Sequence, residues 1–153
     1  MTEVINVKIL HLVLKKKWYE MQERGEKTEE YREITPYFLV RLFEMNDDEV
    51  TGNYKPMSKK TAQDIVNHPE CSEMLSEAIE CYDIRARYTH VCFHYGYTQR
   101  CFINRIDSIT IGRGNPEWGA PTDRDVFIIK HHPSLHPVPL GAPAERQHEQ
   151  QDH

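Results

Sequence analysis

The chain is predicted to fold as an α+β protein, a small mixed β-barrel with helices packed against it. Two observations support this prediction. An apolar, β-branched run near the N-terminus leads into a short amphipathic helix and then into a second extended segment. The strands predicted in the C-terminal half follow one another as hairpins. A parallel α/β sheet would instead alternate strands and helices along the whole chain, so the mixed barrel fits better.

The first three elements follow from apolar spacing and from one glycine. Val4–Leu14 is rich in apolar and β-branched residues and is predicted as a strand. Residues 15–24 are predicted as a helix, because apolar residues recur at i, i+4 and i+7 on one face, at Leu14, Trp18 and Met21. Gly25 follows, and glycine often ends helices because it tolerates positive φ. The chain is then predicted to restart as a strand over Lys27–Ile34.

The later elements are recognised by capping residues and by turns. Thr35 followed by Pro36 is typical of a helix start, with threonine as the N-cap and proline in the first turn. This helix is predicted to end near Glu44. The remaining elements are predicted as a polar loop at 46–56, helices at 58–67 and 69–82, a hairpin with its turn at 95–98, a strand continuation at 108–111, a loop at 112–121 and a last strand at 125–130.

The length of 153 residues suits one domain with a sizeable core. This domain is predicted to span residues 1–132 and to contain a helical insert at about 46–87. From residue 133 to 153 apolar side chains give way to Pro, Gln and His, which predicts a disordered or tag-like tail. The histidines from residue 131 onward have no regular spacing and are expected to bind only nickel resins: His131, His132, His136, His148 and His153.

Composition argues against a membrane or secreted protein. No window approaches the roughly 18 apolar residues that a membrane-spanning helix needs. The N-terminus lacks the basic segment and the long apolar run of a signal peptide. The four cysteines form no C-x-x-C pair, so they are expected to be reduced thiols. A cytoplasmic protein without a membrane partner is therefore expected.

The formal net charge of −5 limits the kind of nucleic-acid binding that is expected. Proteins that coat long duplexes usually have a basic surface, because neutralising phosphates supplies most of their affinity. Broad coating is therefore not expected, whereas a small basic cleft for one nucleotide or a short single strand is compatible with this charge. Residues 15–17 form a short lysine run that is placed to contact phosphates beside such a cleft, although such runs are more often solvated.

The most informative stretch is RGEKTEEYRE, residues 24–33, in which seven of the ten residues are charged. It contains the pattern G-x-K-x-x-E-x-R, formed by Gly25, Lys27, Glu30 and Arg32. Lysine offers a cation to a phosphate or carbonyl oxygen, glutamate accepts protons, and arginine pairs with the glutamate or with a phosphate. Strand alternation puts Glu30 and Arg32 on one face. The alternative is a solvated ladder of surface ion pairs.

The motif and its surroundings, HLVLKKKWYEMQERGEKTEEYREI, resemble the ASCH domain, a relative of the PUA domain. The segments FHYGYT and GRGNPEWGA…FIIK resemble the same group, particularly its small phage-type and bacterial members, and the resemblance covers roughly residues 6–131. It implies a PUA-like pseudo-barrel with flanking helices and a cleft lined by the family's G-x-K-x-x-E-x-R. It also implies an RNA- or nucleotide-binding module, with RNA or a modified nucleoside as partner and with Gly25, Lys27, Glu30 and Arg32 as ligand-binding residues.

Two other functions stay open. Some ASCH proteins are enzymes, including an amidohydrolase of acetylated cytidine and a ribonuclease. In a hydrolase of modified nucleosides or RNA, Lys27 would polarise the scissile group and Glu30 would be the catalytic base. The amidohydrolase branch has a threonine, proposed as nucleophile, where this chain has Glu30, and Thr28 is expected on a different face from Lys27, which argues against that mechanism. The second alternative is a protein-interaction domain that acts through its acidic helical insert.

Trp118 in the loop GNPEWGA is included among the predicted ligand-binding residues. A tryptophan that stacks on a base contributes about 1–3 kcal/mol. In the alternative interpretation, which the flanking proline and glycine slightly favour, Trp118 plugs one end of the barrel.

Neither a metal nor another cofactor is predicted from the sequence. His90, Cys92 and His94 alternate along one predicted strand and would share a face, and imidazole and thiolate are ligands of zinc. A fourth ligand is not evident from the sequence. The alternative is a mixed outer face, with the core residues on the other side of the strand: Val91, Phe93 and Tyr95. The oligomeric state is left open.

Overall fold

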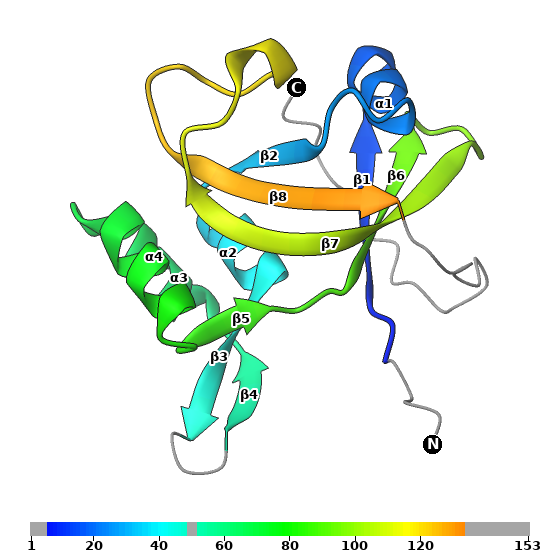
Figure 1. Ribbon diagram of the computed structural model, residues 1–153. Coiled ribbons are helices and arrows are strands. Elements are labelled where there is room, and N and C mark those ends of the chain that lie inside the picture. The colour runs from blue at the N-terminus through cyan, green and yellow to red at the C-terminus, as the bar shows by residue number, and fades with distance from the viewer. Residues whose placement is uncertain (1–5, 49–51, 134–153) are drawn as a thin grey trace. The chain divides into compact units, whose positions relative to one another are not determined.

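The structure, a computed structural model, describes residues 6–48 and 52–133, and these form a mixture of helices and strands (Figure 1). Tertiary contacts divide the chain into two units. Among the described residues, the first unit contains 6–28, 88–107 and 130–133, and the second contains 29–48, 52–87 and 108–129. The mixed α+β class predicted from the sequence is confirmed.

The first unit is built on a parallel pair of strands with an apolar face. Its elements are β1 (Ile9–Leu14), α1 (Lys16–Glu23), β6 (His90–Tyr95) and the adjoining parts of β7 (Cys101–Gly112) and β8 (Val126–Pro133). Figure 1 shows β1 beside β6, to which it runs parallel, whereas β6 and β7 run antiparallel. The register sets Leu10 beside Val91 and Leu12 beside Phe93, and all four side chains are buried. Alternation along the strands therefore buries one shared face.

The helix α1 ends at the predicted glycine. Gly25 has a φ of +80°, and its N–H donates to the Gln22 carbonyl at 3.1 Å. The N–H of Glu26 donates to the Met21 carbonyl at 2.9 Å. These two bonds form a Schellman motif, which satisfies the last carbonyls of the helix and turns the chain toward the motif residues.

The helix predicted at residues 15–24 is confirmed as α1, but the sequence did not indicate which of its side chains are buried. The buried residues of α1 are Tyr19 and Gln22. Tyr19 packs edge-on against Tyr95 and Phe102, with ring centroids 5.1 Å apart in both pairs. Apolar periodicity did not identify this face, because one of its buried side chains is an amide and the other carries a hydroxyl.

A buried polar chain crosses the first unit from β7 through β8 to α1. His131 Nδ1 lies 2.9 Å from Asn104 Nδ2, and His131 Nε2 lies 2.5 Å from Gln22 Oε1. Because the amide nitrogen donates and the amide oxygen accepts, this geometry fits the imidazole tautomer with its proton on Nε2. His131 is only 3% exposed, so its assignment to a resin-binding tail is wrong. His132 lies in β8 as well, and the predicted tail from residue 134 onward lies outside the described residues.

The second unit contains most of the helices, and Thr35 caps the first of them as predicted. The side chain of Thr35 accepts a hydrogen bond from the Phe38 N–H at 3.2 Å, and that of Ser58 accepts one from the Thr61 N–H at 3.1 Å. Besides parts of β7 and β8, the elements of this unit are β2 (Glu29–Glu33), α2 (Pro36–Leu42), β3 (Phe43–Asp48), β4 (Asn53–Pro56), α3 (Lys59–Val66), α4 (Cys71–Glu80), β5 (Ile84–Ala86) and the 3-10 helix η1 (Pro116–Trp118).

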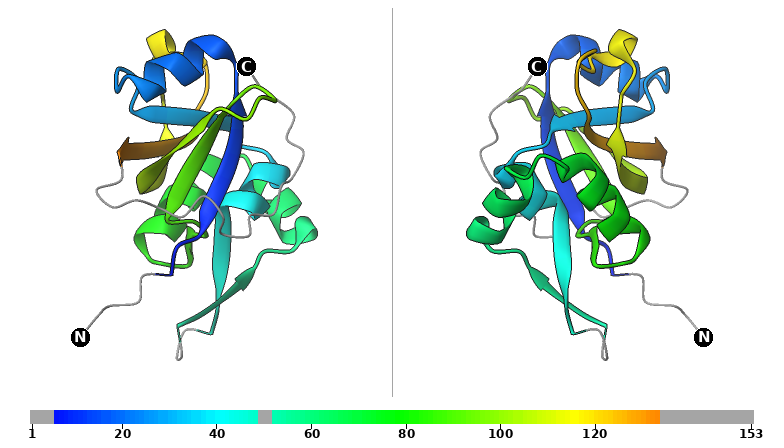
Figure 2. Two further views of the ribbon diagram at one scale, coloured as in Figure 1. Left: turned by 90° about the vertical axis from the view of Figure 1, so that its right-hand side faces the viewer. Right: turned by 90° about the vertical axis from the view of Figure 1, so that its left-hand side faces the viewer.

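The polar loop predicted at 46–56 is wrong. Strands β3 and β4 form an antiparallel hairpin there, and β5 pairs with the other edge of β3. Both views in Figure 2 show β3 and β4 as an extended ribbon. Most side chains of β4 are exposed, so this strand lacks the apolar alternation by which strands are recognised in a sequence. The insert predicted as helical therefore contains a small sheet in addition to α3 and α4.

The other strands are hydrogen-bonded in the order β1-β6-β7-β8-β2, and β7 and β8 each run through both units. The predicted hairpin of β6 and β7 and the predicted continuation at 108–111 are confirmed. The last strand begins one residue later than predicted and extends to Pro133. Among the helices of the described residues, none combines the length and the apolar character that crossing a membrane requires.

Alkaline pH is expected to destabilise the protein through Tyr19. Burial, and then the neighbouring Glu23 carboxylate, raise the pKa of Tyr19 from 10.0 to about 12. Because the folded-state pKa is the higher one, the stability that Tyr19 contributes is fully present below pH 10 and is lost as the pH rises through about 12. The free energy of unfolding of Tyr19→Phe, measured in urea at a series of pH values, should therefore fall less steeply over this interval than that of the wild type.

The matched control for this prediction is Tyr82→Phe, because Tyr82 is 72% exposed. Its free energy of unfolding should follow the wild-type pH dependence. Equal slopes for Tyr19→Phe and the wild type would contradict the role given to Tyr19.

Candidate functional site

The G-x-K-x-x-E-x-R run leaves α1 at Gly25 and enters β2 at Glu29. Its three charged residues, Lys27, Glu30 and Arg32, are 1%, 0% and 2% exposed. Charged side chains are almost never buried to this extent unless they are paired. A solvated ladder of surface ion pairs therefore does not describe these three residues.

Lys27 lies at the end of α1, against a tryptophan. Its backbone N–H donates to the Met21 carbonyl at 3.1 Å, and its Nζ lies 4.9 Å from the centroid of the Trp18 ring. Lys17 Nζ lies 4.7 Å from the same ring. Cation–π contacts of this kind contribute about 0.5–2 kcal/mol each, depending on desolvation. Sequence patterns did not indicate this role for Trp18, because Lys27 reaches its ring only after the chain has turned at Gly25.

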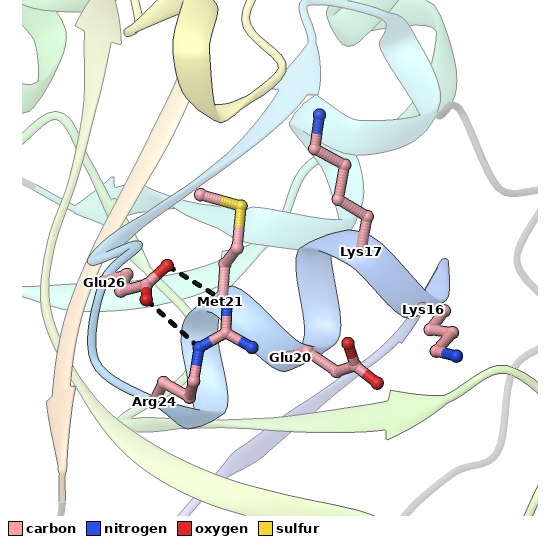
Figure 3. Close-up of a pocket in the computed structure, with 6 residues that line it drawn as sticks. All are labelled: Lys16, Lys17, Glu20, Met21, Arg24 and Glu26. Carbon is pink, nitrogen blue, oxygen red and sulfur yellow. Dashed lines mark hydrogen bonds and ion pairs between the residues drawn. The ribbon is translucent and has the colours of Figure 1, made fainter.

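An open pocket lies along α1 where the motif begins (Figure 3). Its volume is about 470 Å³, and the residues that line it are Lys16, Lys17, Glu20, Met21, Arg24 and Glu26. Arg24 and Glu26 flank Gly25 and form two hydrogen bonds of 3.1 Å with each other. Lys16 and Lys17 of the predicted basic run therefore line a pocket in which the third cation, Arg24, is already paired with Glu26.

Glu30 and Arg32 lie on one face of β2, as predicted. Arg32 Nη1 is 3.5 Å from Glu30 Oε1 and donates a hydrogen bond of 2.8 Å to the Tyr31 carbonyl. Glu30 Oε1 accepts the N–H of Tyr31 at 3.0 Å. The Arg32 guanidinium carbon lies 5.8 Å from the centroid of the Phe38 ring. These contacts hold both charged side chains in fixed orientations.

Tyr31 points to the opposite face of β2 and holds the loop that follows β7. Its hydroxyl donates to a Glu29 carboxylate oxygen at 2.7 Å and accepts the backbone N–H of Asn115 at 3.0 Å. Burial raises the pKa of Tyr31, so the hydroxyl keeps the proton that it donates to Glu29. No sequence pattern indicated the role of this tyrosine, because the loop that it holds lies far away along the chain.

Trp118 belongs to this loop and is partly buried. It packs on a core cluster that contains Tyr31 and Val126. Since Tyr31 and the pair of Glu30 and Arg32 lie on opposite faces of β2, the structure groups Trp118 with the tyrosine and not with the charged pair. This placement agrees with the packing role that the flanking proline and glycine favour.

Comparisons with known protein families, with curated proteins and with solved structures find no match for this chain. Among the residues predicted to bind ligand, Gly25 and Lys27 belong to the first unit, and Glu30, Arg32 and Trp118 belong to the second. Function is therefore inferred from the chemistry of these residues within each unit.

Proposed function

We propose that the protein is an RNA- or nucleotide-binding module of the ASCH type with a PUA-like fold, and that Gly25, Lys27, Glu30 and Arg32 are its ligand-binding residues. The observation that carries this proposal is the burial of all three charged side chains of the motif. Burying charge is unfavourable, and a buried ion pair contributes little net stability compared with apolar residues of similar size. Charges that are nevertheless kept out of water in this way are typical of a functional site.

The chemistry of the three side chains suits a nucleotide. Lys27 and Arg32 carry only donors, as recognition of phosphate or carbonyl oxygens requires. The Glu30 carboxylate carries only acceptors, as recognition of the amino or imino edge of a base requires. The segment from Lys27 to Arg32 thus supplies both the hydrogen-bond donors and the hydrogen-bond acceptors that a nucleotide requires.

The pocket beside Gly25 supports the same function. Its volume of about 470 Å³ falls within the range of roughly 300–1,000 Å³ that is usual for small-molecule sites. Lys16 and Lys17 provide cations for phosphate groups at its edge. The acidic balance of the whole chain, with a net charge of −5, favours a short single strand over an extended duplex.

The proposal is tested by titrating the protein with a short single-stranded RNA, a hairpin and a duplex at several salt concentrations, together with a panel of free nucleosides analysed for turnover. The expected result is weak binding that prefers the single strand and depends little on salt. Tight duplex binding with a steep salt slope would contradict it, because such a slope requires many phosphate contacts. Turnover of a nucleoside or of RNA would identify the hydrolase instead, and neither binding nor turnover would favour the protein-interaction domain.

A pair of double variants shows whether the pocket takes part. Lys16→Ala/Lys17→Ala should weaken single-strand binding and reduce its salt slope by about 0.7 for each phosphate that is no longer neutralised. Lys59→Ala/Lys60→Ala removes the same charge from two exposed positions at the start of α3 and should bind like the wild type. Equal weakening by both double variants would mean that only net charge matters.

A further inference from the structure

Three metal-ligating side chains meet on the sheet of the first unit, on the face opposite its apolar core. They are His11 from β1 and Cys92 and His94 from β6. Each offers one ligand atom, and these atoms all lie within 4.8 Å of one another. Cys92 is only 1% exposed, and the two histidines are half-buried.

Strand register explains how the cluster forms. The parallel pairing of β1 with β6 sets His11 directly beside Cys92, and alternation puts His94 on the same face. His11 Nδ1 lies 2.7 Å from His94 Nε2, and the two ring centroids are 5.0 Å apart. The sequence pointed to His90 as the third candidate, which is wrong for this cluster, because β1 supplies a histidine from a distant part of the chain.

The separations suit a tetrahedral metal ion after small side-chain movements. Zinc bonds of about 2.0–2.1 Å to nitrogen and 2.3 Å to sulfur place two ligand nitrogens about 3.3 Å apart, and a nitrogen and a sulfur about 3.6 Å apart. In the structure the two nitrogens lie 2.7 Å apart, and all three ligand atoms lie within 4.8 Å of one another. For the two nitrogens, the zinc separation requires the imidazoles to open by about half an ångström.

A second thiol stands beside the three ligands. Cys101 in β7 is paired with His94 in the antiparallel register, so its side chain leaves the sheet on the same face. Cys92 and Cys101 are both free thiols, and structural zinc sites are usually four-coordinate with cysteine and histidine ligands.

We propose that His11, Cys92, His94 and Cys101 form a binding site for a transition-metal ion, with zinc as the preferred metal. Two thiolates and two imidazoles match the ligands of zinc better than those of magnesium or calcium, which prefer oxygen. A bound ion would join β1, β6 and β7 within the first unit. This site uses none of the residues of the nucleotide-binding function proposed above, so the two proposals are tested independently of each other.

The test uses cobalt as a spectroscopic substitute for zinc. The whole chain is treated with a chelator, kept reduced and titrated with Co²⁺. We expect one equivalent of cobalt to give a thiolate-to-cobalt charge-transfer band, and Zn²⁺ to displace it. Histidines elsewhere in the chain can bind cobalt but cannot give this band. A wild-type protein without the band would overturn the proposal.

Variants assign the ligands. Cys92→Ser should abolish most of the band, and Cys101→Ser should weaken it. Cys71→Ser/Cys81→Ser removes the two thiols of the second unit and should keep it fully. If circular dichroism shows that Cys92→Ser fails to fold, His11→Gln replaces it in the test, because position 11 is only half-buried. His11→Gln should bind cobalt about tenfold more weakly than the wild type, or worse. Three results would contradict the site: an unchanged band in Cys92→Ser, unchanged affinity in His11→Gln, or loss of the band in the Cys71/Cys81 variant. An unchanged band in Cys101→Ser would overturn only the role of Cys101 as a ligand.

Discussion

Arg32→Ala is expected to lower the free energy of unfolding by about 3–5 kcal/mol, the usual effect of removing one partner from a buried ion pair. Arg32 and Glu30 are 2% and 0% exposed, and their Nη1 and Oε1 atoms lie 3.5 Å apart. The substitution removes that cation from a carboxylate that stays in the interior. It also removes the hydrogen bond to the Tyr31 carbonyl and the contact with the Phe38 ring. Urea denaturation of the wild type and the variant measures the difference.

The same strand offers a matched control for this prediction. Glu33 forms an ion pair with Arg124 in which both side chains are about half exposed, so Arg124→Ala should change the free energy of unfolding by only about 0–1 kcal/mol. Adding Glu30→Gln to Arg32→Ala should restore part of the lost stability, because the buried negative charge is then gone. A loss below 1 kcal/mol for Arg32→Ala, equal to that of Arg124→Ala, would show that the buried charges do not depend on each other.

Gly114→Ala is expected to destabilise the protein by about 1–3 kcal/mol through overpacking, or to prevent correct folding. A methyl group at this position would lie 2.6 Å from Tyr31 Cε1 and 2.6 Å from Ala120 Cβ. The tyrosine ring cannot move away easily, because its hydroxyl is bonded both to Glu29 and to the Asn115 N–H. Urea denaturation should show the loss, and near-ultraviolet circular dichroism should show a changed tyrosine environment.

Gly112 provides the comparison for this substitution. A methyl group there would meet only Ile128 Cδ1, at the ordinary contact distance of 3.6 Å. Gly112→Ala should therefore leave the free energy of unfolding within about 0.5 kcal/mol of the wild type, as for most substitutions without a steric conflict. If Gly114→Ala is equally mild, Tyr31 does not hold the 112–121 loop as closely as the structure shows.

Elements with local chemical signals could be predicted from the sequence. Thr35 with Pro36 and the serine at position 58 begin helices through their own side-chain caps, and Gly25 ends one through its positive φ. The hairpin of β3 and β4 could not be predicted in this way. Its strands are held by backbone hydrogen bonds to neighbouring strands. The side chains of β4 are mostly exposed and show no alternation of apolar and polar residues.

The candidate site was predictable only in part, for a related reason. A motif of four residues in one segment is visible in a sequence, and strand alternation correctly put Glu30 and Arg32 together. Contacts between distant segments are not visible. The packing of Trp118 on Tyr31, the two lysines at Trp18 and the meeting of His11 with Cys92 all depend on strand register or on chain turns.

The central claim, that the buried charges of the motif bind a ligand, is tested most directly by single-strand RNA binding of Lys27→Met and Glu30→Gln. Methionine keeps the apolar stem of Lys27 against Trp18, and glutamine keeps the shape of Glu30 while replacing an acceptor-only carboxylate by an amide. Both variants should remain folded by circular dichroism and bind about tenfold more weakly or worse, since a hydrogen bond to a charged group contributes about 1.5–3 kcal/mol. Glu33→Gln, an exposed change on the same strand, should bind like the wild type. Wild-type affinity in both Lys27→Met and Glu30→Gln would contradict the claim and leave these charges with a structural role alone.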